Sequence, residues 1–113
     1  MYIDGKVWIG NNDQGERIGI IPKMVNRHGL VAGATGTGKT VTLKVMAETF
    51  SDMGIPVFMA DVKGDIAGMM NPGTDSEDMQ KRIEKFNLTN AGFAYKGYPV
   101  TLWDIYGVKG TQL

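Results

Sequence analysis

The stretch "GATGTGKT", residues 33–40, constrains this chain more than any other part of its sequence. It contains three glycines, three threonines and a lysine, and it follows the short apolar run from Leu30 to Ala32. Apolar residues then recur at helical spacing, at Leu43, Met46, Ala47 and Phe50. Gly54 favours the end of that helix. The sequence therefore predicts a buried strand over 30–32, a glycine-rich loop, and a helix that starts near Gly38.

A G-x-x-x-x-G-K-[ST] pattern between a strand and a helix is the Walker A pattern, which indicates a phosphate-binding loop. Backbone N–H groups from Thr35 to Thr40 can point inward because Gly36 and Gly38 have no Cβ. The amino-terminal end of the helix favours an anion further. We expect Lys39 to reach the β- and γ-phosphate oxygens and the Thr40 hydroxyl to ligate Mg²⁺. A chance match in a chain with 16 glycines is the alternative, and the flanking strand and helix count against it.

Site residues follow from this pattern, with ATP and Mg²⁺ as the cofactors. The predicted nucleotide-binding residues are Gly33, Ala34, Thr35, Gly36, Thr37, Gly38, Lys39, Thr40 and Val41. Thr40 is the predicted magnesium ligand, and Lys39 and Asp61 are the predicted catalytic residues.

The acidic cluster in "VFMADVKGD" has two interpretations. An Asp at the end of an apolar strand, here Asp61, is either a metal partner of the Walker B kind or a turn former at the strand end. Lys63 and Asp65, taken alone, are more simply solvated charges. The sole histidine, His28, is interpreted as a residue at the start of the strand over 30–32 rather than as a base.

The remaining pattern indicates an α/β fold. Three short apolar runs over 2–21, separated by the turn signals "DG" and "NNDQG", predict an N-terminal β-meander in a segment 1–22. The P-loop NTPase core is assigned to 23–113. "IPVFMAD", residues 55–61, predicts a second buried strand and hence a βαβ unit with a right-handed crossover. "YPVTLWDIYG", residues 98–107, predicts a third core strand.

A second helix is predicted between these last two strands, after an irregular loop with room for one helical turn. Thr74 and Glu77 have the spacing of a capping box. Met79, Ile83 and Phe86 form an apolar stripe over the turns that follow. The tryptophans Trp8 and Trp103 are interpreted as core or sheet-face residues rather than as a base-stacking platform.

Composition excludes some classes of function. A chain of 113 residues with 42% hydrophobic and 21% charged residues has the composition of one globular domain. Twelve basic residues balance twelve acidic ones, so no basic surface indicates nucleic acid or an anionic membrane. The absence of cysteine excludes a thiolate metal site. No apolar run approaches the roughly 20 residues of a membrane span. We expect a cytoplasmic protein with no membrane partner.

The segment "NRHGLVAGATGTGKTVTLKVMAETFSDMGIPVFMADVKGDIAG" resembles the bacterial HerA-like helicase family of the HerA/FtsK group of P-loop motor ATPases. The similarity extends on through "PVTLWDIYG". "DVKGD" is similar to a signature of related DNA pumps and conjugation coupling ATPases, which favours site roles for Asp61, Lys63 and Asp65. The resemblance implies a partial RecA-like P-loop NTPase sheet, a homo-oligomeric hexameric ring, and ATP hydrolysis coupled to DNA translocation.

Members of that family continue past the point that corresponds to Leu113, and the resemblance places their Walker B Asp-Glu pair and arginine finger there. We therefore expect this chain to be the ATP-cradling amino half of a motor. By itself it should bind ATP or ADP, hydrolyse ATP negligibly, and bind no DNA. Two alternatives remain open: a non-catalytic nucleotide-binding module, and a small-molecule P-loop kinase. A kinase needs lid arginines, and Arg82 is the one arginine after the predicted P-loop helix.

Overall fold

The structure is a computed structural model that describes residues 1–61, 64 and 66–112. It is of the α/β class, and it divides into two compact units, residues 1–58 with 75–94 and residues 59–74 with 95–113. The first unit contains β1 (Tyr2–Ile3), β2 (Lys6–Asn11), β3 (Arg17–Ile20), η1 (Pro22–Met24), α1 (Lys39–Asp52), α2 (Glu77–Lys85) and η3 (Thr89–Ala91). The second contains η2 (Ala67–Met70), β4 (Trp103–Asp104) and β5 (Thr111–Gln112). Within the described ranges, neither α-helix has the length and apolar character that a bilayer span requires.

The first three strands form an antiparallel sheet in the order β1-β2-β3. Ile3 pairs with Lys6 across a two-residue turn in which Asp4 and Gly5 both have positive φ, at 52° and 74°. Such a turn matches the twist of the strands on either side, which is why the "DG" signal predicts a hairpin. The β2–β3 turn is held by the Asn12 side chain, whose Oδ1 accepts from the N–H groups of Gln14 and Glu16. The strands of the predicted β-meander are therefore present.

Helix α1 packs on β2, and this contact contains the most buried residues of the first unit. Val7 on β2 and Thr49 on α1 are both 0% exposed, and Ala47 is 6% exposed. The Thr49 hydroxyl donates to the Val45 carbonyl at 2.8 Å and accepts from the Met1 amino group. Its polar atom is thus paired, as burial requires. The predicted helix is confirmed, with Gly54 two residues beyond its last residue.

The second predicted helix is confirmed as α2, but its cap differs from the prediction. Ser76 is the N-cap, and its side chain accepts from the N–H of Met79 at 3.1 Å. The predicted capping box of Thr74 and Glu77 is wrong, because the helix starts at Glu77 and the cap must be the residue before it. Asp75, Ser76 and Thr74 all have side chains suited to capping, so composition alone does not separate them.

The carboxyl end of α2 is attached to the meander by contacts between residues far apart in sequence. Ile83 is 8% exposed. The ring of Phe86 meets the indole of Trp8 edge-on, with centroids 6.0 Å apart and an interplanar angle of 63°. Nη2 of Arg17 donates to the carbonyl of Asn87 at 2.9 Å. The predicted apolar stripe on α2 therefore faces the core, and Trp8 is a sheet-face residue as expected.

The predicted core strands differ most from the observed structure. Residues 30–32 and 55–61 are in no strand, Leu30 is 89% exposed and Phe58 is 80% exposed. Of residues 98–107, only β4 is strand, paired in parallel with β5. The prediction of two buried strands and a βαβ unit is wrong for the described residues. A strand needs a neighbour to complete its hydrogen bonds, and in this part of the chain neither segment has a strand partner.

Short-range hydrogen bonds hold the turn that follows β4 in the second unit. Oδ2 of Asp104 accepts from the N–H groups of Lys109 and Val108, at 3.0 and 2.9 Å, and Oδ1 accepts from Tyr106 at 2.9 Å. These backbone donors, that of Lys109 first, hold the pKa of the Asp104 carboxyl below its usual value. The helical turn expected between 62 and 73 is present as η2. Trp103 is 57% exposed, so it is not a core residue.

The contact between β2 and α1 predicts a difference between two neighbouring substitutions. Val7→Ala should lower the free energy of unfolding by about 2 kcal/mol, because it removes two buried methyl groups and leaves a cavity. Ile9→Ala on the same strand is the matched control, and we expect a loss of no more than about 1 kcal/mol because Ile9 is 41% exposed. Urea unfolding followed by circular dichroism measures both values. Equal losses would contradict the assignment of Val7 to the core.

Candidate functional site

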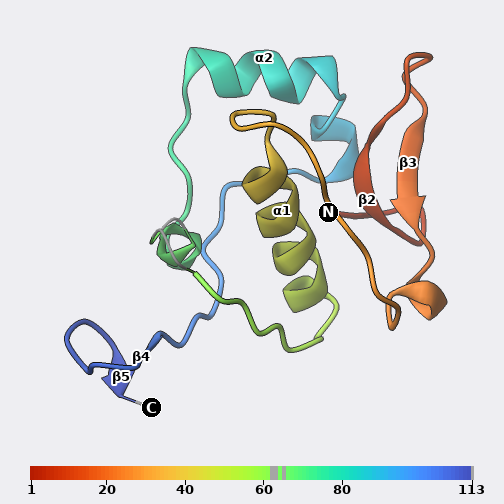
Figure 1. Ribbon diagram of the computed structural model, residues 1–113. Helices are drawn as coiled ribbons and strands as arrows, with labels where there is room; N and C mark the ends of the chain where they lie inside the picture. The colour runs from red at the N-terminus through yellow and green to blue at the C-terminus, as the bar shows by residue number, and fades with distance from the viewer. Residues whose placement is uncertain (62–63, 65, 113) are drawn as a thin grey trace. The chain divides into compact units, whose positions relative to one another are not determined.

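The glycine-rich loop forms a tight turn immediately before α1. Figure 1 shows this loop in orange, leading into the amino-terminal end of the helix. The N–H of Thr37 donates to the carbonyl of Ala34 at 3.3 Å, which closes a four-residue turn. The third residue of the turn, Gly36, has a φ of 81°. A glycine is required there because an L-residue with a side chain is strained at positive φ.

The amino-terminal end of α1 is open. Gly38 is its N-cap, in the left-handed conformation with φ 93° and ψ 19°, and within the described residues it forms no side-chain cap hydrogen bond. The first N–H groups of a helix have no partner within the helix, and they carry a partial positive charge. The left-handed glycines at 36 and 38 therefore turn the chain just before these donors.

The carbonyl of Ala34 is the centre of the hydrogen bonds within the loop. Nζ of Lys39 folds back and donates to it at 2.9 Å, and the Thr37 hydroxyl donates to the same oxygen at 2.6 Å. The sequence predicted that Ala34 belongs to the site, but it did not predict that this carbonyl accepts from two side chains. Every residue has a carbonyl, so no sequence pattern could have identified this one.

The predicted site residues from Gly33 to Val41 lie together because they are consecutive. Lys39 is half-buried, whereas Thr40 is exposed in the first turn of α1 and Val41 is 53% exposed. In the described ranges, no group of three or more His, Asp or Glu side chains could hold a metal ion. The role of the Thr40 hydroxyl as a magnesium ligand stays a prediction.

The Asp61 carboxylate accepts hydrogen bonds from backbone N–H groups that follow it closely in the chain. Its Oδ1 accepts from the N–H of Gly64 at 2.8 Å, and its Oδ2 accepts from the N–H of Ile66 at 2.9 Å. This is the turn-forming role that the sequence left open for it. Asp61 belongs to the second unit and the glycine-rich loop to the first, so its catalytic role stays a prediction. Lys63 and Asp65 lie outside the described residues.

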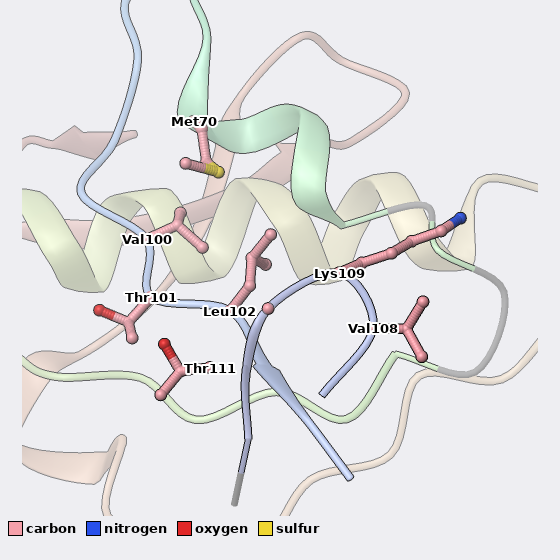
Figure 2. A pocket seen from close by; sticks show the side chains of 8 residues that line it. Met70, Val100, Thr101, Leu102, Val108, Lys109 and Thr111 are labelled. Carbon is pink, nitrogen blue, oxygen red and sulfur yellow. The ribbon is translucent and has the colours of Figure 1, made fainter. Parts of the chain in front are cut away.

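One further sequence interpretation is wrong, and the structure has a depression that the sequence did not indicate. His28 is exposed and lies in no strand, so its interpretation as a strand-start residue is wrong. The second unit has a depression of about 500 Å³, and Figure 2 shows the side chains around it, among them Met70, Val100, Leu102, Val108 and Lys109. None of the residues that line this depression was predicted to be a site residue.

Comparison with known families places nearly the whole chain in one of them. Residues 6–113 match the family described as helicase HerA-like, C-terminal. No curated protein and no solved structure gives a significant match. The match covers β2 and β3 of the meander, the glycine-rich loop and the second unit, and it leaves out β1.

The positive φ of Gly36 predicts that its substitution is costly even though nothing surrounds it. A Cβ at Gly36 would meet no atom within 4 Å, so any effect of Gly36→Ala comes from backbone strain. We expect a loss of about 1 kcal/mol in the free energy of unfolding. Gly29→Ala is the control, since Gly29 also has open space and its φ lies outside the left-handed region. It should be neutral or slightly stabilising. Thermal unfolding of both variants measures this, and equal midpoints would reject strain at Gly36.

Proposed function

This chain belongs to the HerA-like helicase family, and we propose that it is the ATP-binding portion of a DNA-translocating motor ATPase. One observation carries the proposal: the glycine-rich loop leads into the amino-terminal end of α1, and the Lys39 ammonium of that first turn donates back to the loop at the Ala34 carbonyl. Gly36 and Gly38 are both left-handed, α1 has no side-chain cap, and Lys39 already lies across the loop. Together these features fit an anion with several oxygen atoms, such as a triphosphate.

The residues of the loop fit Mg·ATP in their chemistry. Backbone N–H groups between Thr35 and Thr40 would bind phosphate oxygens, and Lys39 would exchange the Ala34 carbonyl for a phosphate. The exposed Thr40 hydroxyl would ligate Mg²⁺, which takes oxygen ligands and neutralises charge on the phosphates. Catalysis would then need a group that activates water, and the catalytic role predicted for Asp61 is tested below by ATP turnover.

We further propose that residues 30–32 and 55–61, which lie in no strand in this structure, join a RecA-like sheet in the assembled protein. The high exposure of Leu30 and Phe58 supports this, because exposed apolar residues in β-prone segments favour burial against a partner. In this proposal the motor works as a homo-oligomeric ring, and neighbouring subunits complete the nucleotide site. Analytical ultracentrifugation with and without Mg·ATP tests the ring, and a monomer under both conditions would count against it.

A non-catalytic nucleotide-binding module is the second candidate. The geometry of Asp61 favours it, because both of its carboxylate oxygens already accept backbone hydrogen bonds. A carboxylate in that position is less available as a base. The two candidates share the phosphate-binding loop and differ in turnover, so release of inorganic phosphate separates them.

Replacing Lys39 tests nucleotide binding directly. Lys39→Ala should weaken Mg·ATP binding by at least about tenfold, because it removes a charged hydrogen bond to the phosphates. Lys44→Ala on the same helix is the matched control and should bind like the parent. Isothermal titration calorimetry gives both affinities. If Lys39→Ala binds as tightly as the parent, the loop is not the phosphate site.

ATP hydrolysis is measured on the parent, Lys39→Ala and Lys44→Ala. We expect this chain alone to release negligible phosphate from ATP, since an arginine finger by itself contributes about 10³ to 10⁵ in rate. If the parent releases phosphate and Lys39→Ala does not, the chain is not a non-catalytic nucleotide-binding module. That result would favour a catalytic role for Asp61.

DNA is the proposed partner of the assembled motor rather than of this chain alone. The chain has a formal net charge of zero, and DNA binding depends on basic residues that meet phosphates. We expect no binding of single- or double-stranded oligonucleotides at physiological salt, measured by fluorescence anisotropy. Micromolar binding that weakens steeply with added salt would show that this chain already carries a DNA surface.

A further inference from the structure

Three donors converge on the carbonyl oxygen of Ala34. The Thr37 hydroxyl lies at 2.6 Å, the Lys39 ammonium at 2.9 Å and the Thr37 N–H at 3.3 Å. A carbonyl oxygen has two lone pairs, so the two short contacts, both from side chains, account for its capacity. The Thr37 hydroxyl makes the shortest of the three.

The same hydroxyl explains why residue 33 is a glycine. A Cβ on Gly33 would lie 2.5 Å from Oγ1 of Thr37, closer than real Cβ atoms approach another heavy atom. Unlike Gly36 and Gly38, Gly33 does not have a left-handed φ. Backbone conformation therefore does not demand a glycine here. The space for the Thr37 side chain demands it.

The hydrogen bond from Thr37 to Ala34 does not depend on Lys39. When the Lys39 ammonium leaves Ala34 to meet a phosphate, the Ala34 carbonyl loses one of its two side-chain donors. The Thr37 hydroxyl still donates to the Ala34 carbonyl. Because this hydrogen bond joins residues only three apart, it preserves the turn. A loop that keeps its shape while its lysine moves has less to reorganise on binding.

We propose that Thr37 is a positioning residue of this loop: its hydroxyl holds the Ala34 carbonyl so that Lys39 is free to bind phosphate, and Gly33 provides the space for that hydroxyl. The proposal rests on the proposed binding of nucleotide. Thr37 acts through the Ala34 carbonyl and Lys39 rather than on the reacting atoms. A β-branched threonine suits this role because its χ1 angle is restricted.

Isosteric replacement separates the hydroxyl from the shape of the side chain. Thr37→Val keeps the shape and removes the donor, whereas Thr37→Ser keeps the donor. Thr37→Val should weaken Mg·ADP binding by about twofold to tenfold, which corresponds to one hydrogen bond, and Thr37→Ser should restore most of the loss. Because the loop is exposed, the thermal midpoint should change little in either variant. A loss of affinity equal in both variants would assign the effect to packing and overturn the proposal.

A second measurement needs no nucleotide. In the free protein, the carbonyl ¹³C resonance of Ala34 should move upfield in Thr37→Val and return toward the parent position in Thr37→Ser. If the parent binds Mg·ADP but Thr37→Val changes neither this resonance nor the affinity, the positioning role is wrong and the proposed function stands. If the parent does not bind Mg·ADP, the proposed function fails and the positioning role fails with it, whatever the resonance does.

A double-mutant cycle of Gly33 and Thr37 tests whether Gly33 provides the space for the Thr37 hydroxyl. Gly33→Ala should weaken Mg·ADP binding in the parent, because the new methyl group displaces the Thr37 hydroxyl. In a Thr37→Ala background the same change should cost little, since the nearest remaining Thr37 atom, Cβ, lies at an ordinary 3.5 Å. Residues in contact show such non-additive effects. Additive losses would show that Gly33 is required for a reason unrelated to Thr37.

Discussion

The burial of β2 against two helices is the constraint on which the first unit depends. Val7 lies fully buried where α1 packs on the sheet, and Trp8, next along the strand, contacts Phe86 at the end of α2. A helix of the length of α1 is marginal in water by itself, so its stability comes from this packing. The glycine-rich loop has its shape only if α1 begins at Lys39. The meander, which contributes none of the predicted site residues, therefore supports the site through the helix.

The hydrogen bonds that hold the loop join residues close in sequence. The Ala34 carbonyl accepts from Thr37, three residues on, and from Lys39, five residues on. A site of this kind needs few long-range contacts, because its geometry comes from backbone conformation at Gly36 and Gly38 and from the start of one helix. This locality explains why a short motif can specify the conformation of a loop. It also makes the loop sensitive to single atoms, such as the Thr37 hydroxyl.

The exposed apolar segments around Leu30 and Phe58 differ from the loop, because a strand depends on neighbouring strands rather than on nearby residues. Leu30 and Phe58 have the side chains of buried strands, yet both are largely exposed. Strand propensity describes how well a side chain fits a pleated, half-buried surface, and that surface exists only when neighbouring strands are present. A larger sheet in the assembled protein is our proposal for these segments.

The sequence by itself determined the features whose causes are local. It predicted the hairpin at Asp4 and Gly5, both helices, the N-terminal meander and the continuous segment from Gly33 to Val41. These follow from turn conformation, from apolar periodicity and from spacing, none of which needs a distant partner. Even the wrong cap on α2, Thr74 in place of Ser76, is an error of two residues among several suitable side chains.

Only the tertiary structure decided which apolar residues are buried and where each polar atom donates or accepts. Val7 is fully buried and Leu30 is not, although both lie in short apolar runs, because α1 covers β2 and no strand pairs with residues 30–32 among the described residues. The Ala34 carbonyl accepts hydrogen bonds from two side chains because Gly36 turns the chain and Gly33 leaves room for Thr37. Burial and hydrogen bonding depend on which atoms meet in space, and a linear pattern specifies that only for near neighbours.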